Sequence, residues 1–516
     1  MTKRKQATQS ALIIIFFTLS SKLIGFIREV LIAAKFGSGM ETDSYFVAIT
    51  ATGLIIGLVS NAIATTFIPV MSEVEAKEGR MGKLEHTNNM INVIFILSVI
   101  LLILGWIASP VIVRILAKGF VGEQFELTVK LNRIAMPMIL FSGIVGVLTG
   151  FLHSENKFAT SSALGFPRNF VYIIFLLFFS SKYGIVGLMV ASTIAVASQV
   201  IILIPDAIKS GFKYKLTADI KDIYVRRILI LSIPVLISVA INDLNAIVDR
   251  TLASSLEVGS ISALNYANRL INLVLGVFIS AVTTVIFPLL SSESNNGNLD
   301  GLKRVMGNGI NIIMIMTVPA SVGMIALAKP IIEIAFQRGS FDVVATMMSS
   351  QALRFYSIGL VAMALNPLFA RVYYSLQDTK TPMLNGAISV LINIILNLIL
   401  VRYMAHSGLA LATSIATTIA TIMLLYGLKK KIGSLGTKGY ITTLLKTGLA
   451  SGIMGLVAYL IYQVMYEVLG VSKLYNLVSL LVAIGVGVIV YLVLCYVFKV
   501  DEVREVVGKV KDRLVR

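Results

Sequence analysis

Long blocks of apolar residues follow one another along the whole chain, separated by short polar loops. Each block has about 20 residues or more, the length that an α-helix needs to cross a hydrocarbon core of about 30 Å. Only 14% of the 516 residues are charged, compared with roughly 25% in soluble domains. A soluble fold has no interior that could bury so many blocks. The sequence therefore predicts an all-α polytopic membrane protein.

The hydropathy pattern divides the chain into about fourteen expected transmembrane helices. Their expected bounds are 10–36, 44–72, 89–117, 127–153, 161–181, 184–208, 227–253, 259–290, 305–336, 346–376, 382–403, 407–428, 440–467 and 474–498. Proline interrupts several of these spans, as at Pro69, Pro137 and Pro288. Transport helices tolerate such breaks because neighbouring helices or cavity water satisfy the freed backbone groups.

Lysine and arginine are concentrated in alternate loops. The basic segments are the two tails, 77–83, 209–227 and 429–438, whereas 37–43, 254–258 and 337–345 between them contain only Arg338. Basic loops stay in the cytoplasm, so we expect both termini there and an even number of spans. This distribution also accounts for the net charge of +18, and no nucleic-acid partner is expected.

An internal repeat indicates two lobes. AIATTFIPVMS at 62–72 matches AVTTVIFPLLS at 281–291, and GFLHSENK matches VYYSLQDTK at a similar offset. Chance similarity between apolar segments would not reproduce the matched prolines and polar helix ends. We expect two parallel six-helix lobes. Their bounds are 1–222 and 223–436, and 437–516 adds two further helices and a basic cytoplasmic tail.

Charged residues share one side of the first expected span. Lys22, Gly25, Arg28 and Glu29 fall within an arc of about 120° at the helical 100° per residue. A lysine near a helix end can reach the membrane interface, but Lys22 lies about twelve residues into the span. A cationic strip at that depth indicates a cavity.

The second and eighth expected spans each carry a polar face. The members are Asp43, Thr50, Gly57 and Asn61 on the second span and Asn265, Asn268, Arg269 and Asn272 on the eighth. Asparagines alone could be explained as hydrogen-bonding contacts between helices. That explanation fits Arg269 less well, because a buried arginine needs an acid or an anion.

A second set of residues resembles the ligands of a small hard cation. Asp243 lies inside the seventh expected span, and its nearest base on the same face, Arg250, is two turns away. The eleventh and twelfth spans add Asn393, Asn397 and Thr413. One acid with amide and hydroxyl oxygens suits sodium better than calcium. Hydrogen bonding among these groups across the helices is the alternative.

Motifs of soluble catalysis are missing from the sequence. It contains no P-loop, HExxH, GxSxG or Gly-rich dinucleotide loop, and one cysteine, Cys495. An enzyme alternative rests on Glu41 and Asp43, because membrane-embedded glycosyltransferases hold a divalent metal with such acidic pairs. Acids near helix N-termini are common, however.

Five runs of residues resemble one family. They are SKLIGFIREVLIAAKFGSGMETDSYFVA, FIPVMSE, NYANRL, FQRGSF and YYSLQDTKTP, and the resemblance covers about residues 10–430. The family is MviN/MurJ, the lipid II flippases of peptidoglycan synthesis, within the multidrug/oligosaccharidyl-lipid/polysaccharide exporter superfamily. The resemblance implies fourteen helices in two lobes around a cationic cavity, with the last two helices forming a lipid-facing groove. It also implies a bacterial plasma membrane with membrane lipids and other cell-wall synthesis proteins as neighbours.

The resemblance also implies functional residues. The family's substrate-binding positions fall on Lys22, Arg28, Asp43 and Arg269. The second helix departs from the pattern, because Ile56, Gly57 and Asn61 stand where relatives have an arginine pair and a glutamate. The sodium site of some members falls on Asp243, Asn393, Asn397 and Thr413, with Asn397 in place of an aspartate.

The function that we expect is therefore a transporter rather than an enzyme. It would carry lipid II, the undecaprenyl-diphosphate-linked disaccharide-pentapeptide, from the inner to the outer leaflet by alternating access. An exporter of another lipid-linked oligosaccharide or of a cationic drug is the alternative. A drug exporter would need acids where Lys22 and Arg28 stand. Apart from sodium, no cofactor is expected.

Overall fold

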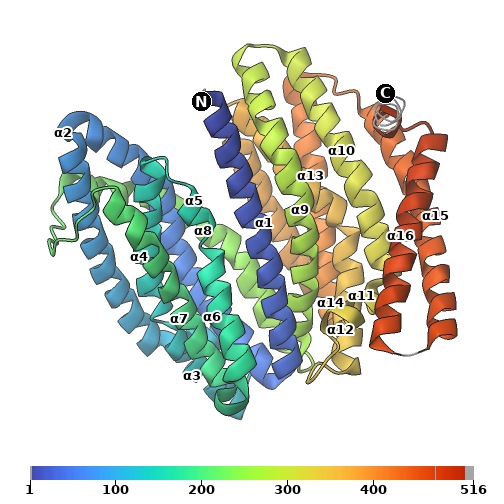
Figure 1. The fold of residues 1–516 in the computed structure, drawn as a ribbon, viewed down its shortest axis with the longest axis horizontal. Helices are drawn as coiled ribbons and strands as arrows, with labels where there is room; N and C mark the ends of the chain where they lie inside the picture. Colours follow the sequence, from blue (N-terminus) through green and yellow to red (C-terminus); the bar gives the residue numbers. More distant parts are fainter. Residues whose placement is uncertain (1–2, 471, 506–516) are drawn as a thin grey trace. The chain divides into compact units, whose positions relative to one another are not determined.

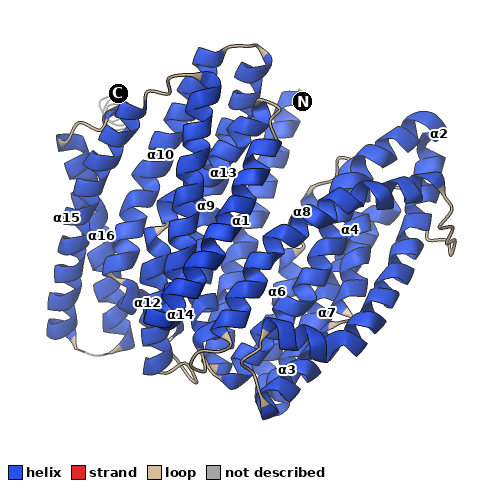
Figure 2. Cartoon of the chain, turned by 180° about the vertical axis from the view of Figure 1, so that it is seen from behind, coloured by secondary structure: helices blue, strands red, loops and turns tan. Residues whose placement is uncertain are grey.

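The chain folds into α-helices. In the computed structural model, the described residues are 3–470 and 472–505; the side chains of 3–15, 61, 62, 64, 65, 234, 235, 237–242, 277–285 and 287 lie outside the description. Within these limits every regular element is a helix, without a strand (Figure 2). The expected all-α membrane fold class is confirmed.

Two compact units divide the chain, Met1–Ser262 and Ala263–Arg516. The first contains α1 (Lys3–Phe36), α2 (Met40–Leu116), α3 (Gly122–Ala135), α4 (Met138–Ser154), α5 (Ala159–Ser162), α6 (Gly165–Phe178), α7 (Ser180–Lys209) and α8 (Ile223–Ala253). α9 (Ser260–Asn295) starts in the first unit and continues into the second. The second also holds α10 (Leu299–Ala326), α11 (Ala328–Phe336), α12 (Val343–Ile358), α13 (Leu360–Ser375), α14 (Lys380–Ile432), α15 (Thr437–Leu469) and α16 (Lys473–Val497).

The boundary between the units lies one helix later than the boundary of the sequence repeat. α8 packs along α2, and the hydroxyls of Thr66 and Ser232 lie 3.3 Å apart at this contact. α8 therefore belongs to the first compact unit. The two six-helix lobes remain a prediction from the repeat.

Backbone breaks relate the helices to the expected spans. α2 covers the second and third spans and is broken at Gly79, where φ is 71°. α14 covers the eleventh and twelfth and is broken at Ala405, where φ is 48°. Other spans are divided in two: Pro137 separates α3 from α4, and Gly359 separates α12 from α13, which are bent by 45°.

Several helices are apolar and long enough to cross a membrane. Nine qualify among the described residues, or ten if α12 and α13 form one span. Two of these segments have 51 and 53 residues, more than one crossing of about 20 residues requires. These helices show a multi-pass membrane protein, and the total of fourteen spans remains a prediction.

The two polar helix ends of the sequence repeat adopt the same turn. Lys157 N donates to Leu152 O at the end of α4, and Asp378 N donates to Tyr373 O at the end of α13. In both turns the preceding residue, Asn156 or Gln377, has a positive φ. This geometry satisfies the last carbonyls of a helix. The shared turn supports a duplicated origin for the two segments.

Each unit has its own apolar core. Phe67, Met71 and Phe151 lie in the core of the first unit, where α2 packs against α4. Met306 and Leu368 lie in the core of the second, between α10 and α13. The α15–α16 pair lies side by side (Figure 1), and α15 packs against α10. Many large apolar side chains on α15 and α16 remain exposed, as expected for helices that face lipid.

Candidate functional site

The predicted cations of α1 lie beside a close contact between α1 and α6. A Cβ atom on Gly165 of α6 would lie 1.6 Å from Ser21 Oγ, so the helices approach at a position that accepts only glycine. Asn169, one turn further along α6, donates from Nδ2 to the carbonyl of Ser21 at 3.2 Å. Asn169 Oδ1 accepts a hydrogen bond from Arg28 Nη1 at 3.1 Å. The contact therefore orients Arg28.

Arg28 is also paired within its own helix. Its Nη2 lies 2.6 Å from Glu29 Oε1, and Glu29 is 3% exposed. The guanidinium carbon lies 4.9 Å from the centre of the Tyr172 ring on α6. An acid, an amide and an aromatic face thus hold Arg28 in one orientation and compensate part of its charge.

Lys22 differs from Arg28. Its side chain is exposed on α1. Within the described part of the chain, no hydrogen bond or ion pair involves its ammonium group. A membrane-spanning helix that carries such a cation needs an anion, water or a lipid headgroup beside it.

Asp43 caps the first turn of α9. Its Oδ2 accepts from Gly259 N at 2.7 Å, and its Oδ1 accepts from Ser262 N at 2.8 Å and from the Ser262 hydroxyl. Asp43 is 2% exposed, whereas Glu41 is exposed. A carboxylate at this position satisfies N–H groups that a helix start leaves without partners. Both oxygens of Asp43 are therefore occupied by protein, and a role in substrate binding stays a prediction.

The rest of the predicted polar face on α2 contributes little charge. The side chain of Asn61 lies outside the described residues. Thr50 donates its hydroxyl hydrogen bond to Phe46 O of its own helix at 2.7 Å. Ile56 and Gly57, at the positions where the family has charges, are partly exposed. The departure from the family pattern therefore leaves this part of α2 without a described charged group.

The polar face of α9 lies in the second unit. Arg269 is exposed and makes an interaction within the protein. Asn268 and Asn272 hydrogen-bond to each other through their side chains. Tyr266, which is buried, packs against Phe336 with ring centres 5.1 Å apart. This aromatic contact fixes α9 against the end of α11.

Three of the four predicted sodium ligands lie together in the second unit. Asn393 Nδ2 donates to Thr413 Oγ1 at 3.3 Å, and Asn397 Nδ2 donates to Asn393 Oδ1 at 2.7 Å. Asp243 belongs to the first unit. Hydrogen bonding across the two arms of α14, the alternative to a cation site, is present in this cluster. The described residues include no group of three His, Cys, Asp or Glu side chains that could hold a metal ion.

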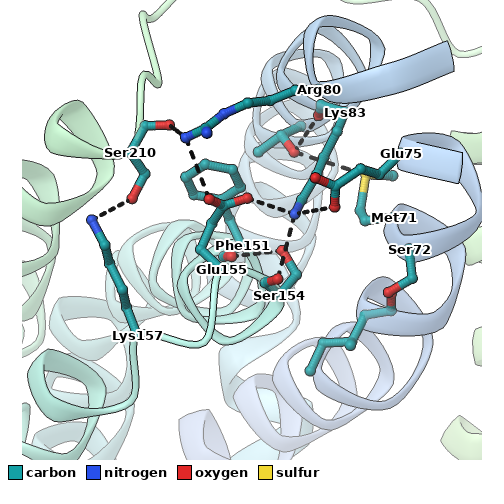
Figure 3. A network of polar contacts seen from close by, with 12 residues as sticks. Met71, Ser72, Glu75, Arg80, Lys83, Phe151, Ser154, Glu155, Lys157 and Ser210 are labelled. Atoms are coloured by element: carbon teal, nitrogen blue, oxygen red, sulfur yellow. Dashed lines mark hydrogen bonds and ion pairs between the residues drawn. The ribbon is translucent and has the colours of Figure 1, made fainter. Parts of the chain in front are cut away.

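A charged network that the sequence reasoning missed ties the two arms of α2 to the end of α4 (Figure 3). Lys83 is 1% exposed, and its Nζ lies 2.8 Å from Glu75 Oε2 and 2.6 Å from Glu155 Oε1. Arg80 lies 3.4 Å from Glu155 and donates to the carbonyl of Ser210 at 2.8 Å. In the sequence, Arg80 and Lys83 indicated only which side of the membrane their loop lies on.

Comparison with known proteins identifies the family. The family model described as lipid II flippase MurJ matches residues 32–481. The chain belongs to the MurJ family of lipid II flippases. A probable lipid II flippase MurJ of Vibrio cholerae is 30% identical over 444 residues, which cover 83% of this chain and 84% of the relative. The counterpart in Haemophilus influenzae is 30% identical over 432 residues, with 80% and 84% covered.

Solved structures agree with this membership. A lipid II flippase MurJ in an inward closed conformation has a TM-score of 0.78 and 28% identity, covering 95% of this chain and 100% of that one. An inward-facing multidrug resistance MATE family transporter of the MOP superfamily has a TM-score of 0.68 at 13% identity, with 83% and 99% covered. The second similarity shows the shared fold alone. A family of flippases is a family of transporters, so the glycosyltransferase alternative is not favoured.

Proposed function

We propose that this chain moves lipid II from the inner to the outer leaflet by alternating access, and that Lys22, Arg28 and Arg269 hold the diphosphate of the substrate. Membership of the MurJ family supports the transport of lipid II. Asp43 and Asn61 complete the proposed set of substrate residues.

Lys22 is the observation that carries the proposed binding mode. It is an exposed cation well inside α1 for which the described residues provide no acid. In a low-dielectric cavity a diphosphate is attracted strongly to such a group, and hydrogen bonds to ionised oxygens are roughly twice as strong as neutral ones. Arg28 adds an oriented guanidinium on the same helix, six residues further on.

Complementation tests this role. A bacterium depleted of its own lipid II flippase should grow when it produces the unaltered chain. Lys22→Ala, Arg28→Ala and Arg269→Ala should each abolish growth while the protein remains abundant in the membrane. Lys130→Ala and Arg226→Ala, which remove exposed charges elsewhere, serve as controls. Full growth with two of the three test variants would reject the binding mode but leave the flippase function standing.

The energy source is a separate question. The sequence contains no ATPase motif. Membrane potential supplies about 2.3 kcal/mol per elementary charge per 100 mV. We also propose sodium as a coupling ion, with Asp243, Asn393, Asn397 and Thr413 as ligands. The cluster of Asn393, Asn397 and Thr413 supports this proposal by gathering amide and hydroxyl oxygens.

Thermal stability distinguishes the two sources of energy. Sodium at about 0.1 M should raise the melting temperature of the purified protein above that in potassium at equal ionic strength, because an ion that binds the folded state stabilises it. The gain should vanish in Asp243→Ala. Identical melting in the two salts would contradict the sodium site and leave membrane potential as the source.

A further inference from the structure

A ladder of asparagines holds the loop between α7 and α8 against the second arm of α2. Asn88 donates from Nδ2 to Lys213 O at 2.8 Å and accepts from Lys215 N at 2.9 Å. Asn92, one turn further along, donates to the carbonyls of Lys215 and Thr217, both at 2.8 Å. These bonds satisfy the backbone of a segment that has no regular secondary structure.

The end of the same loop is also anchored. Asn89 exchanges two hydrogen bonds with the backbone of Asp219 and donates to Asp222 Oδ2 at 2.9 Å. Asp222 also caps α8 and contacts His86. Burial alone would raise the pKa of Asp222, but hydrogen bonds from Asn89, Val225 and His86 hold it below its ordinary value. The loop is therefore held against α2 at both of its ends and forms an ordered wall.

This wall closes one side of an apolar cavity. The cavity has a volume of about 680 Å³ and lies between the second arm of α2, α4, α7 and the loop. Its size falls within the range of about 300–1,000 Å³ that small-molecule sites occupy. Its lining is apolar except for Asn92, Lys213 and Tyr214. Phe95 and Ile204 extend this lining onto exposed helix surface.

Lys213 is the one side chain of this lining whose polar group has no described partner. The amide of Asn92 hydrogen-bonds through both its nitrogen and its oxygen to the loop, and Tyr214 donates its hydroxyl hydrogen bond to Asn92 Oδ1 at 2.7 Å. The neighbouring acids Asp206, Asp219 and Asp222 form their hydrogen bonds and ion pairs with other groups.

The loop itself has the composition of a membrane interface. Lys215 and Lys221 are exposed on it, beside Leu216, which is 85% exposed, and Ile220. Apolar side chains next to lysines suit the boundary between headgroups and acyl chains. The cavity mouth therefore combines hydrocarbon with uncompensated positive charge.

We propose that this cavity is a site for an anionic phospholipid, with one acyl chain against the apolar lining and the phosphate at Lys213. None of the proposed substrate residues lines the cavity, so this proposal does not depend on the proposed function. The bound lipid would fasten the loop and the first unit to the leaflet in which it lies.

Fluorescence quenching by brominated lipid tests the proposal. Trp106 is the only tryptophan of the chain, so Phe95→Trp in a Trp106→Phe background reports on the cavity alone. The protein is placed in phosphatidylcholine nanodiscs that contain a small fraction of brominated phosphatidylglycerol. Quenching should indicate an enrichment of about fivefold over random mixing, the ratio that corresponds to about 1 kcal/mol for one lysine near an anionic lipid.

Matched variants separate the site from the general membrane surface. Phe170→Trp in the same background places the reporter on exposed α6, outside the cavity, and should report random mixing. Lys213→Glu should abolish the enrichment at position 95, because it replaces the cation that holds the phosphate with an acid. The hydrogen bond of residue 213 to the asparagine ladder involves its backbone carbonyl and remains. Lys221→Glu makes the same charge change on the same loop and should leave most of the enrichment at position 95. Brominated phosphatidylcholine should show no enrichment there.

Two outcomes would overturn the proposal. One is equal quenching at positions 95 and 170 by phosphatidylglycerol, which would mean an ordinary lipid-facing surface. The other is an enrichment that Lys213→Glu and Lys213→Gln both leave intact although the variants melt like the parent protein.

Discussion

At the scale of single residues, the structure separates two kinds of charged group within the same predicted set. Arg28 and Asp43 have defined partners inside the first unit: Glu29 and Asn169 for Arg28, and the first turn of α9 for Asp43. Lys22 has none among the described residues. Charged residues predicted from the sequence to share one function therefore differ in structure: Arg28 is an oriented cation, Asp43 caps a helix, and Lys22 is an exposed cation.

Asp43 gives a residue-scale prediction. Asp43→Ala removes three hydrogen bonds and leaves buried N–H groups of Gly259 and Ser262 without acceptors. We expect a loss of about 2 kcal/mol of stability or more, measured as a lower melting temperature of the purified protein. Asp43→Asn should be intermediate, because its amide keeps one acceptor.

Glu41→Ala is the matched control, since Glu41 is exposed two residues before Asp43. It should melt like the unaltered protein. If Asp43→Ala melts normally but fails to complement, Asp43 acts on the substrate and its role as a cap is minor.

Sequence reasoning found the charges of α1 because charged residues are rare in apolar spans. It missed Asn169 and Lys83 for different reasons. Asn169 is a neutral residue on α6, and its importance depends on a contact with Ser21 that is remote in sequence. Lys83 lies in a segment where basic residues already had an explanation in topology, so nothing marked it as buried between Glu75 and Glu155.

At the scale of helices, hydropathy predicted the all-α membrane fold class, because the hydrocarbon core imposes the length of each apolar block. It could not predict how neighbouring spans connect. α2 and α14 are each broken at a single residue between two expected spans, Gly79 in α2 and Ala405 in α14. The asparagine ladder was equally out of reach, because Asn88 pairs with a loop 125 residues away.

Substitutions at the two helix breaks should change the stability of the protein in opposite directions. Ala405 adopts φ 48° and ψ −133°, a conformation that only glycine adopts without strain. Ala405→Gly should raise stability by about 1 kcal/mol, since the strain released exceeds the roughly 0.4–1 kcal/mol of added unfolded-state entropy. Ala405 is exposed, so no packing is lost.

Gly79→Ala is the counterpart. Gly79 has φ 71° and ψ −172°, and an added Cβ would meet no atom within 4 Å. Its effect is therefore purely conformational, and we expect destabilisation by about 1–3 kcal/mol. Both variants are compared by melting temperature in one detergent. Changes of the same sign in both would show that backbone strain does not control these breaks.

At the scale of the whole molecule, the apolar helices establish that the chain crosses the membrane several times. The direction of the crossings rests on charge. The segments 77–83, 209–227 and 429–438 are basic, and we propose that they lie in the cytoplasm with both termini. The charged network of Figure 3 includes Arg80 and Lys83 of the first of these segments. It gives some of these basic residues a structural role in addition to topology.

Cysteine labelling tests the orientation. Cys495 is buried and is replaced by alanine to give a background without thiols. Single cysteines then go to Gly39, where an added Cβ meets nothing within 4 Å, and to the exposed Glu257. An impermeant thiol reagent should label both in intact cells, because the scarcity of lysine and arginine in these loops predicts that they lie outside.

Cysteines at Glu85 and Ser434, both exposed and beside basic residues, are the matched positions on the other side. They should react only after the cells are opened, which also shows that their thiols are accessible. Labelling of Glu85 and Ser434 positions in intact cells, with protection of Gly39 and Glu257, would place both termini outside. In that case the mouth of the proposed phospholipid site, which the 211–222 loop borders, would face the outer leaflet rather than the inner one.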